Sequence, residues 1–208
     1  ILYFARRVDL QSADMHDHSW NSRLMPGAKN RTLGLVGFGG IGTEVAKRAV
    51  PFGMKVIYFC RHPNPADDAA YGVQSVSMEE LLKESDYVVA AVPLTDQTFH
   101  LFNEECIAQM KAGSVLINIA RGPVVDEEAL AQALASGHLG GCAVDVFPKE
   151  PCTDSVLTRY SNALLTPHSA TSTAENSKAT NFAAANNLVN YLKKDIDAKY
   201  VVVQGTRY

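Results

Sequence analysis

The chain has 208 residues, of which 47% are hydrophobic and 20% charged, and its formal net charge is −3. This length and composition are typical of one or one and a half soluble globular domains with a sizeable buried core. The small negative charge gives no electrostatic support for a nucleic-acid partner, and no apolar run has the length of a membrane span. The four cysteines include no C-x-x-C pair, so we expect reduced thiols in a cytoplasmic protein.

The first thirty residues predict little regular structure. Residues 1–8 (ILYFARRV) are typical of the end of an apolar helix, and residues 9–31 are typical of a polar connecting loop. His16 and His18 lie in this loop without a further side chain at metal-ligand spacing. We therefore expect both histidines to be solvated loop residues and expect no metal site.

A glycine-rich turn follows. Residues 33–36 form a short apolar strand that runs into G-x-G-x-x-G, from Gly37 to Gly42, and then into a helix from about 41 to 50. Gly37 allows a tight turn, Gly39 lets the backbone approach a pyrophosphate, and Gly42 lets helix and strand pack closely. The amides at the helix start, those of Gly40 and Ile41 included, offer hydrogen-bond donors to an anion. A second apolar strand at 56–59 completes a βαβ unit, which favours a dinucleotide site over a purely structural turn.

Strands and helices keep alternating down the chain. After a loop with Pro63 and Pro65, the pattern predicts strands at 73–76, 87–92, 115–119, 142–146 and 163–166. It predicts helices that start after Ser77, Asn103 and Asp126, a long helix after Thr171 to about Lys194, and an extended segment at 201–203. This alternation predicts a doubly wound α/β domain with a parallel sheet covered on both faces.

Ligands of such sheets bind beyond the carboxyl ends of the strands. These ends hold Arg121, Asp145, Glu150 and His168. An arginine can bind a carboxylate in bidentate fashion, a histidine can deliver a proton near neutral pH, and a neighbouring carboxylate can orient that histidine. The set fits an oxidoreductase that acts on an anionic carbonyl compound. The alternative, unrelated loop residues, stays open at this point.

Four longer stretches are more specific, and they read SDYVVAAVPLTDQT, AGSVLINIARGPVVDEEALAQAL, GGCAVDVFPKEP and LLTPHSA. They resemble the D-isomer-specific 2-hydroxyacid dehydrogenases, a family that includes glyoxylate and hydroxypyruvate reductases and has a Rossmann-like dinucleotide-binding domain. The resemblance implies that Arg121 binds the carboxylate and carbonyl of a small 2-oxo acid, that His168 is the acid/base, and that Glu150 pairs with His168. It also implies a homodimer and further cofactor contacts, at Asp145 with the nicotinamide carboxamide and at Val92, Pro93, Thr98, Ala120 and Ala170.

The choice between NAD and NADP depends on the end of the strand at 56–59. An NAD site usually has an acid there that accepts from the ribose 2′-hydroxyl. Here the chain reads Cys60-Arg61-His62, which has no acid and offers an arginine for a 2′-phosphate. We therefore expect NADP, with NAD as second choice, and expect Arg61 and His62 to contact the cofactor. The alternative is that Arg61 points into solvent.

The resemblance also implies a flavodoxin-like substrate domain, most of which has no counterpart in this sequence. We expect a helix remnant and linker at 1–30, a dinucleotide-binding domain at 31–170, and a helix with a return segment at 171–208. Two hypotheses follow. The parent protein is an NADP-preferring 2-ketoacid reductase, or this chain is a nucleotide-binding module without turnover that serves as a sensor or interaction protein.

Overall fold

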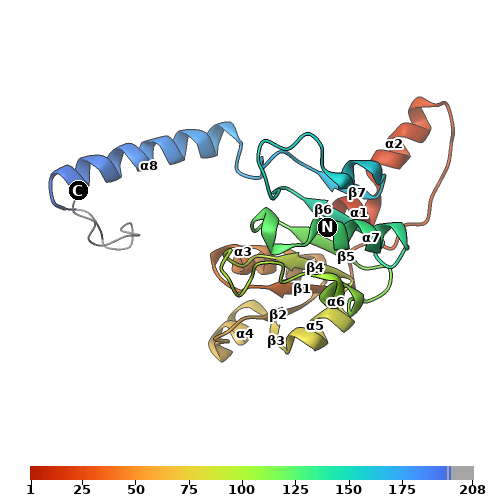
Figure 1. Ribbon diagram of the computed structural model, residues 1–208, viewed down its shortest axis with the longest axis horizontal. Helices are drawn as coiled ribbons and strands as arrows, with labels where there is room; N and C mark the ends of the chain where they lie inside the picture. The colour runs from red at the N-terminus through yellow and green to blue at the C-terminus, as the bar shows by residue number, and fades with distance from the viewer. Residues whose placement is uncertain (196, 198–208) are drawn as a thin grey trace. The chain divides into compact units, whose positions relative to one another are not determined.

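A computed structural model describes residues 1–195 and 197 of the chain. Its backbone divides into two units, Ile1–Pro167 and His168–Tyr208. The first unit contains a seven-stranded sheet in the order β3-β2-β1-β4-β5-β6-β7, and Figure 1 shows the strands side by side in that order. Every pairing between neighbouring strands is parallel. The predicted doubly wound α/β fold is confirmed.

The strands agree with the sequence prediction to within one or two residues at most ends. They are β1 (Thr32–Val36), β2 (Lys55–Phe59), β3 (Gln74–Ser75), β4 (Tyr87–Ala90), β5 (Val115–Asn118), β6 (Gly141–Val144) and β7 (Ala163–Leu165). Strand β1 pairs with β2 on one side and β4 on the other, so that Val36 lies beside both Phe59 and Ala90. The carboxyl ends of these three strands therefore meet at one place on the sheet edge.

The helices are α1 (Leu2–Arg6), α2 (Val8–His16), α3 (Gly40–Ala49), α4 (Pro65–Tyr71), α5 (Met78–Glu84), α6 (Glu104–Ala108), α7 (Glu127–Ala135) and α8 (Ala174–Leu192). Helices α3 to α7 lie between strands in the chain, α1 and α2 precede β1, and α8 follows β7. Three short 3₁₀ turns are η1 (Val50–Phe52), η2 (Gly122–Val124) and η3 (Val156–Arg159).

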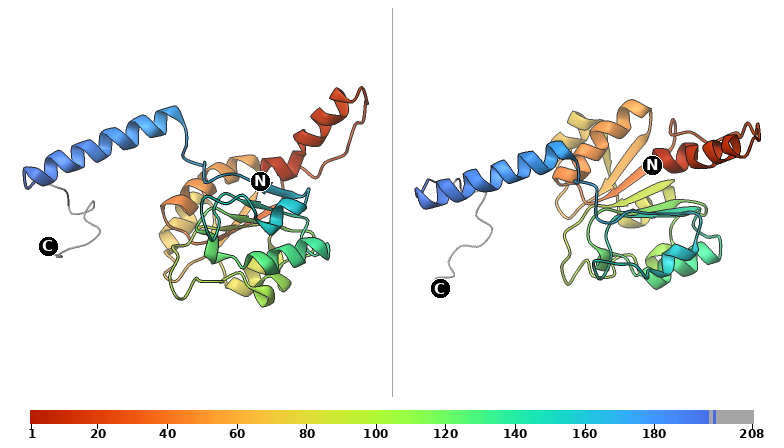
Figure 2. Two further views of the ribbon diagram at one scale, coloured as in Figure 1. Left: turned by 45° about the horizontal axis from the view of Figure 1, so that its top comes forward. Right: turned by 90° about the horizontal axis from the view of Figure 1, so that it is seen from above.

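Helices lie on both faces of the sheet (Figure 2), and buried apolar residues form one cluster on each face. On one face, Leu35 and Val89 join a buried cluster with Ala46 of α3. On the other, Leu116 joins a second cluster with Leu130 of α7. Successive strand residues point to opposite faces, so a strand buried on both faces must be apolar throughout. This requirement explains why the strands appear as continuous apolar runs in the sequence.

Three helices begin at the side-chain caps that the sequence predicts. The Ser77 hydroxyl accepts from the Glu80 amide at 3.1 Å, and the Asn103 side chain accepts from the Cys106 amide at 2.9 Å. Asp126 accepts from the amides of both Glu128 and Ala129. Each cap satisfies amides that the first turn of a helix leaves unpaired.

Two loop predictions are wrong. Residues 8–16 form α2 although we expected a loop from residue 9, and α2 has no buried residue, so no apolar periodicity marks it. Residues 65–71 form α4 although Pro63 and Pro65 indicated a loop. Pro65 occupies the first turn, where a missing amide proton costs little, and Asn64 caps the helix.

The second unit contains the long helix α8, which Thr173 caps by accepting from the Asn176 amide at 3.1 Å. The long helix expected after Thr171 is thus confirmed.

The extended segment expected at 201–203 lies outside the described residues. Within the described residues no helix combines the length and apolarity that a membrane crossing requires.

Candidate functional site

The turn after β1 has the geometry that the glycine pattern predicts. Gly37 has a left-handed φ of 102°, and a Cβ there would lie 2.3 Å from the Ala91 carbonyl oxygen. A Cβ on Gly42 would lie 2.3 Å from the Gly37 carbonyl oxygen, so α3 packs directly against the turn. A Cβ on Gly39, in contrast, would meet nothing within 4 Å. Two of the glycines therefore permit internal packing, and Gly39 leaves open space beside the backbone.

Helix α3 begins in this turn without a side-chain cap. Gly39 is its N-cap residue, and no side chain accepts a hydrogen bond from the first turn. The amides of Gly40 and Ile41 lie in that first turn, and Ile41 is 57% exposed although it is apolar. An uncapped helix start with accessible backbone suits an anionic group such as a phosphate.

A cavity of about 410 Å³ opens beside the turn at the carboxyl ends of β1, β2 and β4. Seven of the predicted cofactor residues line it, namely Gly37, Gly39, Arg61, His62, Val92, Pro93 and Thr98. Its remaining lining residues are Val36, Phe38, Phe59, Cys60, Ala91, Thr95, Gln97 and Leu101. None of these described lining residues is acidic. The cavity therefore offers no carboxylate to a ribose hydroxyl and no repulsion to a phosphate.

Aromatic stacking holds one wall of this cavity. The ring of Phe38 stacks on Tyr58 of β2 with centroids 4.0 Å apart. The Tyr58 hydroxyl donates to Asp68 at 2.8 Å. Burial and this hydrogen bond raise the pKa of Tyr58 to about 12, so the phenol stays neutral at physiological pH. Phe38 is a lining residue that the sequence prediction did not name individually.

The opposite wall is the loop from Pro93 to Thr98. The Thr98 hydroxyl donates to the Pro93 carbonyl at 2.6 Å and accepts from the Thr95 amide at 2.8 Å. The Thr98 hydroxyl therefore makes its hydrogen bonds within the loop, and these bonds stabilise the loop that forms this wall of the cavity. Thr95 and Gln97 were not predicted individually, although they belong to a stretch that follows a buried strand.

The turn after β5 carries Ala120 and Arg121. Asn118, at the end of β5 and only 1% exposed, donates to the Arg121 carbonyl and accepts from the Ala120 amide, both at 3.0 Å. The exposed Arg121 side chain donates to the Ala120 carbonyl at 2.7 Å. This bond uses one guanidinium nitrogen, and the other nitrogens of the exposed guanidinium group can bind a carboxylate. Asn118 was not predicted, because a single polar residue within a buried strand carries no positional signal.

Two acids follow β6. Asp145 is 7% exposed and accepts a hydrogen bond at 2.5 Å from the hydroxyl of Thr166, which follows β7. Glu150 accepts from the Phe147 amide at 2.9 Å. Asp145 therefore lies at the same sheet edge as Arg121, on the next strand along.

His168 and Ala170 belong to the second unit, which begins at His168. They follow β7 in the chain by three and five residues. His168 has a left-handed backbone, with φ at 50°. The described residues contain no group of three side chains that could hold a metal ion.

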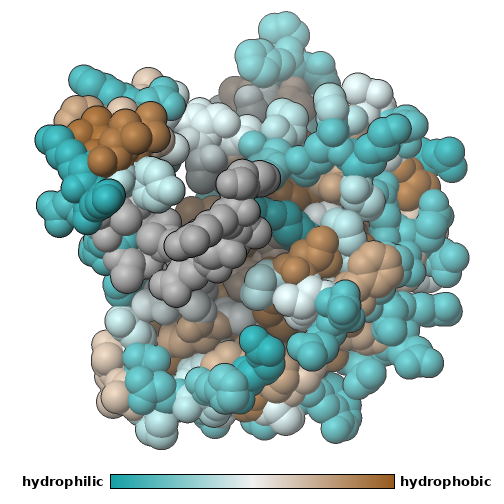
Figure 3. Space-filling view, turned by 60° about the vertical axis from the view of Figure 1, so that its left-hand side comes forward, coloured by the Kyte–Doolittle hydropathy of each residue, from teal (hydrophilic) through white to brown (hydrophobic). Residues whose placement is uncertain are grey.

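Exposed apolar area does not by itself single out a site. On the face that Figure 3 presents, brown apolar side chains lie in separate groups among teal hydrophilic ones.

Residues 1–170 match the family described as "D-isomer specific 2-hydroxyacid dehydrogenase, NAD binding domain". The chain belongs to this family. Among its relatives, the glyoxylate reductase of Thermococcus litoralis is 38% identical over 210 residues, which cover 97% of this chain and 63% of that protein. The hydroxypyruvate reductase of Thermotoga maritima is 41% identical over 181 residues, which cover 84% of this chain and 58% of that protein.

Solved structures of 2-hydroxyacid dehydrogenases have the same fold. A glyoxylate reductase from Paecilomyes thermophila superposes with a TM-score of 0.83 at 35% identity, over 92% of this chain and 59% of that one. A D-lactate dehydrogenase from Aquifex aeolicus, complexed with NAD and lactic acid, gives a TM-score of 0.85 at 30% identity, over 93% of this chain and 64% of that one. This family member therefore spans about three fifths of the length of the relatives that it matches.

The position of Arg121 depends on the glycine that follows it. A Cβ on Gly122 would lie 2.0 Å from the backbone carbonyl carbon of Phe147. We expect Gly122→Ala to destabilise the fold by about 1–3 kcal/mol, because backbone must move to accept the methyl group. Urea unfolding of the purified variant measures this change.

The matched control is Gly40→Ala, since a Cβ on Gly40 would meet nothing within 4 Å. We expect it to leave the free energy of unfolding unchanged or slightly higher. Equal effects of the two substitutions would contradict the packing that we describe around Arg121.

Proposed function

We propose that the cavity beside the glycine turn binds the adenosine and pyrophosphate parts of NADP, with NAD as the second choice. The observation that carries the proposal is the lining at the end of β2, where Arg61 and His62 are exposed and no described lining residue is acidic. A guanidinium group can bind a 2′-phosphate through two parallel hydrogen bonds. The open space at Gly39 and the uncapped start of α3 support the pyrophosphate position.

The proposed reaction is the reduction of a small 2-oxo acid to a 2-hydroxy acid, or the reverse. The names of the relatives, glyoxylate reductase and hydroxypyruvate reductase, support this substrate class. The dinucleotide, when bound, supplies or accepts the hydride. Arg121 binds the substrate carboxylate and polarises the carbonyl, and its exposed guanidinium group above β5 supports this role.

His168 donates a proton to the substrate oxygen in the reduction direction and removes it in the oxidation direction. Glu150 orients His168, and Asp145 accepts from the nicotinamide carboxamide. Thr166 supports the second role, because its hydroxyl orients the Asp145 carboxylate. The remaining proposed contacts with the dinucleotide come from Val92, Pro93, Thr98, Ala120 and Ala170.

The activity belongs to a longer protein in this proposal. Since the chain spans about three fifths of its relatives, we assign it residues 31–170 as the dinucleotide-binding domain, with 1–30 and 171–208 as flanking segments. We also propose a cytoplasmic homodimer. The free state of all four cysteines is consistent with a reducing compartment.

Arg61 provides the test of cofactor preference. We expect Arg61→Asp to weaken NADPH binding and strengthen NADH binding, because an acid repels a 2′-phosphate and accepts from a 2′-hydroxyl. The ratio of the two dissociation constants should change by about tenfold or more, as the loss of a hydrogen bond to a charged group predicts. Isothermal titration calorimetry with both dinucleotides measures this ratio.

Arg159→Asp is the matched control, since Arg159 lies in η3 and does not line the cavity. It makes the same change in net charge and should leave the ratio unchanged. An unchanged ratio in Arg61→Asp itself would refute the role of Arg61.

The reaction is tested by oxidation of NADPH with glyoxylate and hydroxypyruvate, on this chain and on a version that carries the remaining length of the relatives. We expect turnover in the longer version, and a fall in kcat of about 10²–10⁴ in its His168→Ala variant. Binding without turnover in the longer version would favour the nucleotide-binding module instead. Full activity of His168→Ala would place the proton donor elsewhere.

A further inference from the structure

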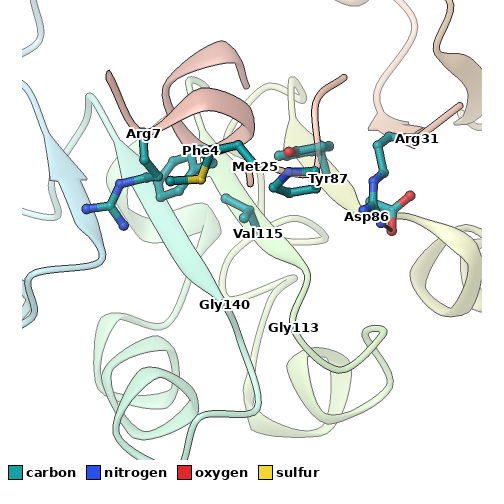
Figure 4. Close-up of a pocket in the computed structure, with 10 residues that line it drawn as sticks. Phe4, Arg7, Met25, Arg31, Asp86, Tyr87, Gly113, Val115 and Gly140 are labelled. Atoms are coloured by element: carbon teal, nitrogen blue, oxygen red, sulfur yellow. Dashed lines mark hydrogen bonds and ion pairs between the residues drawn. The ribbon is translucent and has the colours of Figure 1, made fainter. Parts of the chain in front are cut away.

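A second cavity, of about 370 Å³, lies at the amino ends of the strands, on the edge of the sheet opposite the glycine turn (Figure 4). We call it the amino-end pocket and define it by Phe4, Arg7, Met25, Arg31, Tyr87 and Val115. Phe4 belongs to α1 and Arg7 lies between α1 and α2; the others come from the loop before β1 and from the first residues of β4 and β5. All of them belong to the first unit.

The walls of the amino-end pocket are apolar. Phe4 is 9% exposed and Val115 is 6% exposed, and both belong to the buried cluster on this face of the sheet. Met25 borders the pocket from the loop before β1. The volume and apolar walls suit the body of a small organic molecule such as one with a phenyl ring.

The Tyr87 hydroxyl is the polar group within these walls. Tyr87 is 5% exposed as a whole residue, and its hydroxyl makes no hydrogen bond with any described residue. Among the described residues, the fully buried side-chain polar atoms without a partner are the hydroxyls of Ser85 and Ser114, so the Tyr87 hydroxyl itself is accessible. In Figure 4 the phenol extends into the middle of the pocket, toward Met25. An accessible phenol that pairs with no described residue can donate a hydrogen bond to a ligand in the pocket.

One end of the amino-end pocket carries excess positive charge. Asp86 accepts from Lys111 at 2.8 Å, from Arg31 at 3.3 Å and from the Thr32 amide at 2.8 Å. Two cations thus share one carboxylate. Arg31 contributes one nitrogen to Asp86 and is 39% exposed, so other donors of its guanidinium group remain accessible.

The other end of the pocket is electrically balanced. Arg7 binds Asp9 through two guanidinium nitrogens, at 3.0 and 3.2 Å. The hydroxyl of Tyr3 also donates to Asp9, at 2.8 Å. The net excess is therefore one positive charge at the Arg31 end, which matches a monocarboxylate better than a phosphate dianion.

We propose that the amino-end pocket binds a small monocarboxylate with an aromatic or aliphatic body, the carboxylate lying against Arg31 and a carbonyl or ether oxygen of the body accepting from Tyr87. The pocket is separated from the dinucleotide cavity by the length of the sheet. Occupation of one site therefore leaves the other accessible. The proposal is independent of the function proposed above.

The test uses three ligands that differ by one group. The first, 4-oxo-4-phenylbutanoate, has a carboxylate, a ketone and a phenyl ring; 4-phenylbutanoate lacks the ketone; 4-oxo-4-phenylbutanamide lacks the charge. All titrations use the 208-residue chain with Arg121→Met, saturated with NADPH, so that the proposed substrate site does not contribute. We expect the first ligand to bind with a Kd of about 1 mM, and the other two about three- to tenfold more weakly.

Two substitutions test which pocket residue causes each difference in affinity. Tyr87→Phe should abolish the advantage of 4-oxo-4-phenylbutanoate over 4-phenylbutanoate, because it removes the hydroxyl alone. Arg31→Met should abolish the advantage of the acid over the amide. Arg23→Met is the matched control, since Arg23 is 44% exposed, pairs with Asp14 and lies outside the pocket. It should change neither difference.

Three results would overturn the proposal. They are the absence of saturable binding at about 10 mM, equal binding of acid and amide by the Arg121→Met chain, and differences that survive in both Tyr87→Phe and Arg31→Met. The comparison of acid with amide needs neither pocket substitution, so it stays decisive if Arg31→Met fails to fold.

Discussion

The contact between the turn after β1 and the start of α3 is the constraint on which the site depends. The carbonyl oxygen of Gly37 lies 2.3 Å from where a Cβ of Gly42 would be, and the carbonyl oxygen of Ala91 lies 2.3 Å from where a Cβ of Gly37 would be. Three backbone segments therefore approach one another as closely as backbones can. Because β1 lies between β2 and β4, this contact fixes where α3 begins and brings the ends of β2 and β4 around one cavity.

The two edges of the sheet carry different arrangements of charged side chains. At the carboxyl edge the dinucleotide cavity has a cationic residue, Arg61, and no acid among its described lining residues. At the amino edge Asp86 is held between Arg31 and Lys111, and the pairing stabilises strand starts. Coulomb attraction between exposed charges is weak and screened, so these charges contribute little to the stability of the fold. The buried clusters on both faces supply the stability.

Much of the fold was predictable because its signals are local. Apolar runs located the strands, and Ser77, Asn103 and Asp126 located helix starts through hydrogen bonds that span two or three residues. Helix α2 escaped prediction since it buries no residue. Arg61 and Arg121 were predicted as site residues because each follows a strand. Asn118, Thr166 and Tyr87 were not, because their roles depend on neighbours that only the strand order brings together.

Hydrogen exchange of the backbone amides, with and without NADPH, tests the account most directly, because exchange reports which segments a ligand orders. We expect slower exchange at residues 37–42, 60–62 and 94–98, which contain the glycine turn, the end of β2 and the opposite wall of the cavity. Exchange at the amino edge, around Arg31 and Tyr87, should not change. Unchanged exchange at 37–42 in saturating NADPH, or slowing confined to the amino edge, would contradict the account.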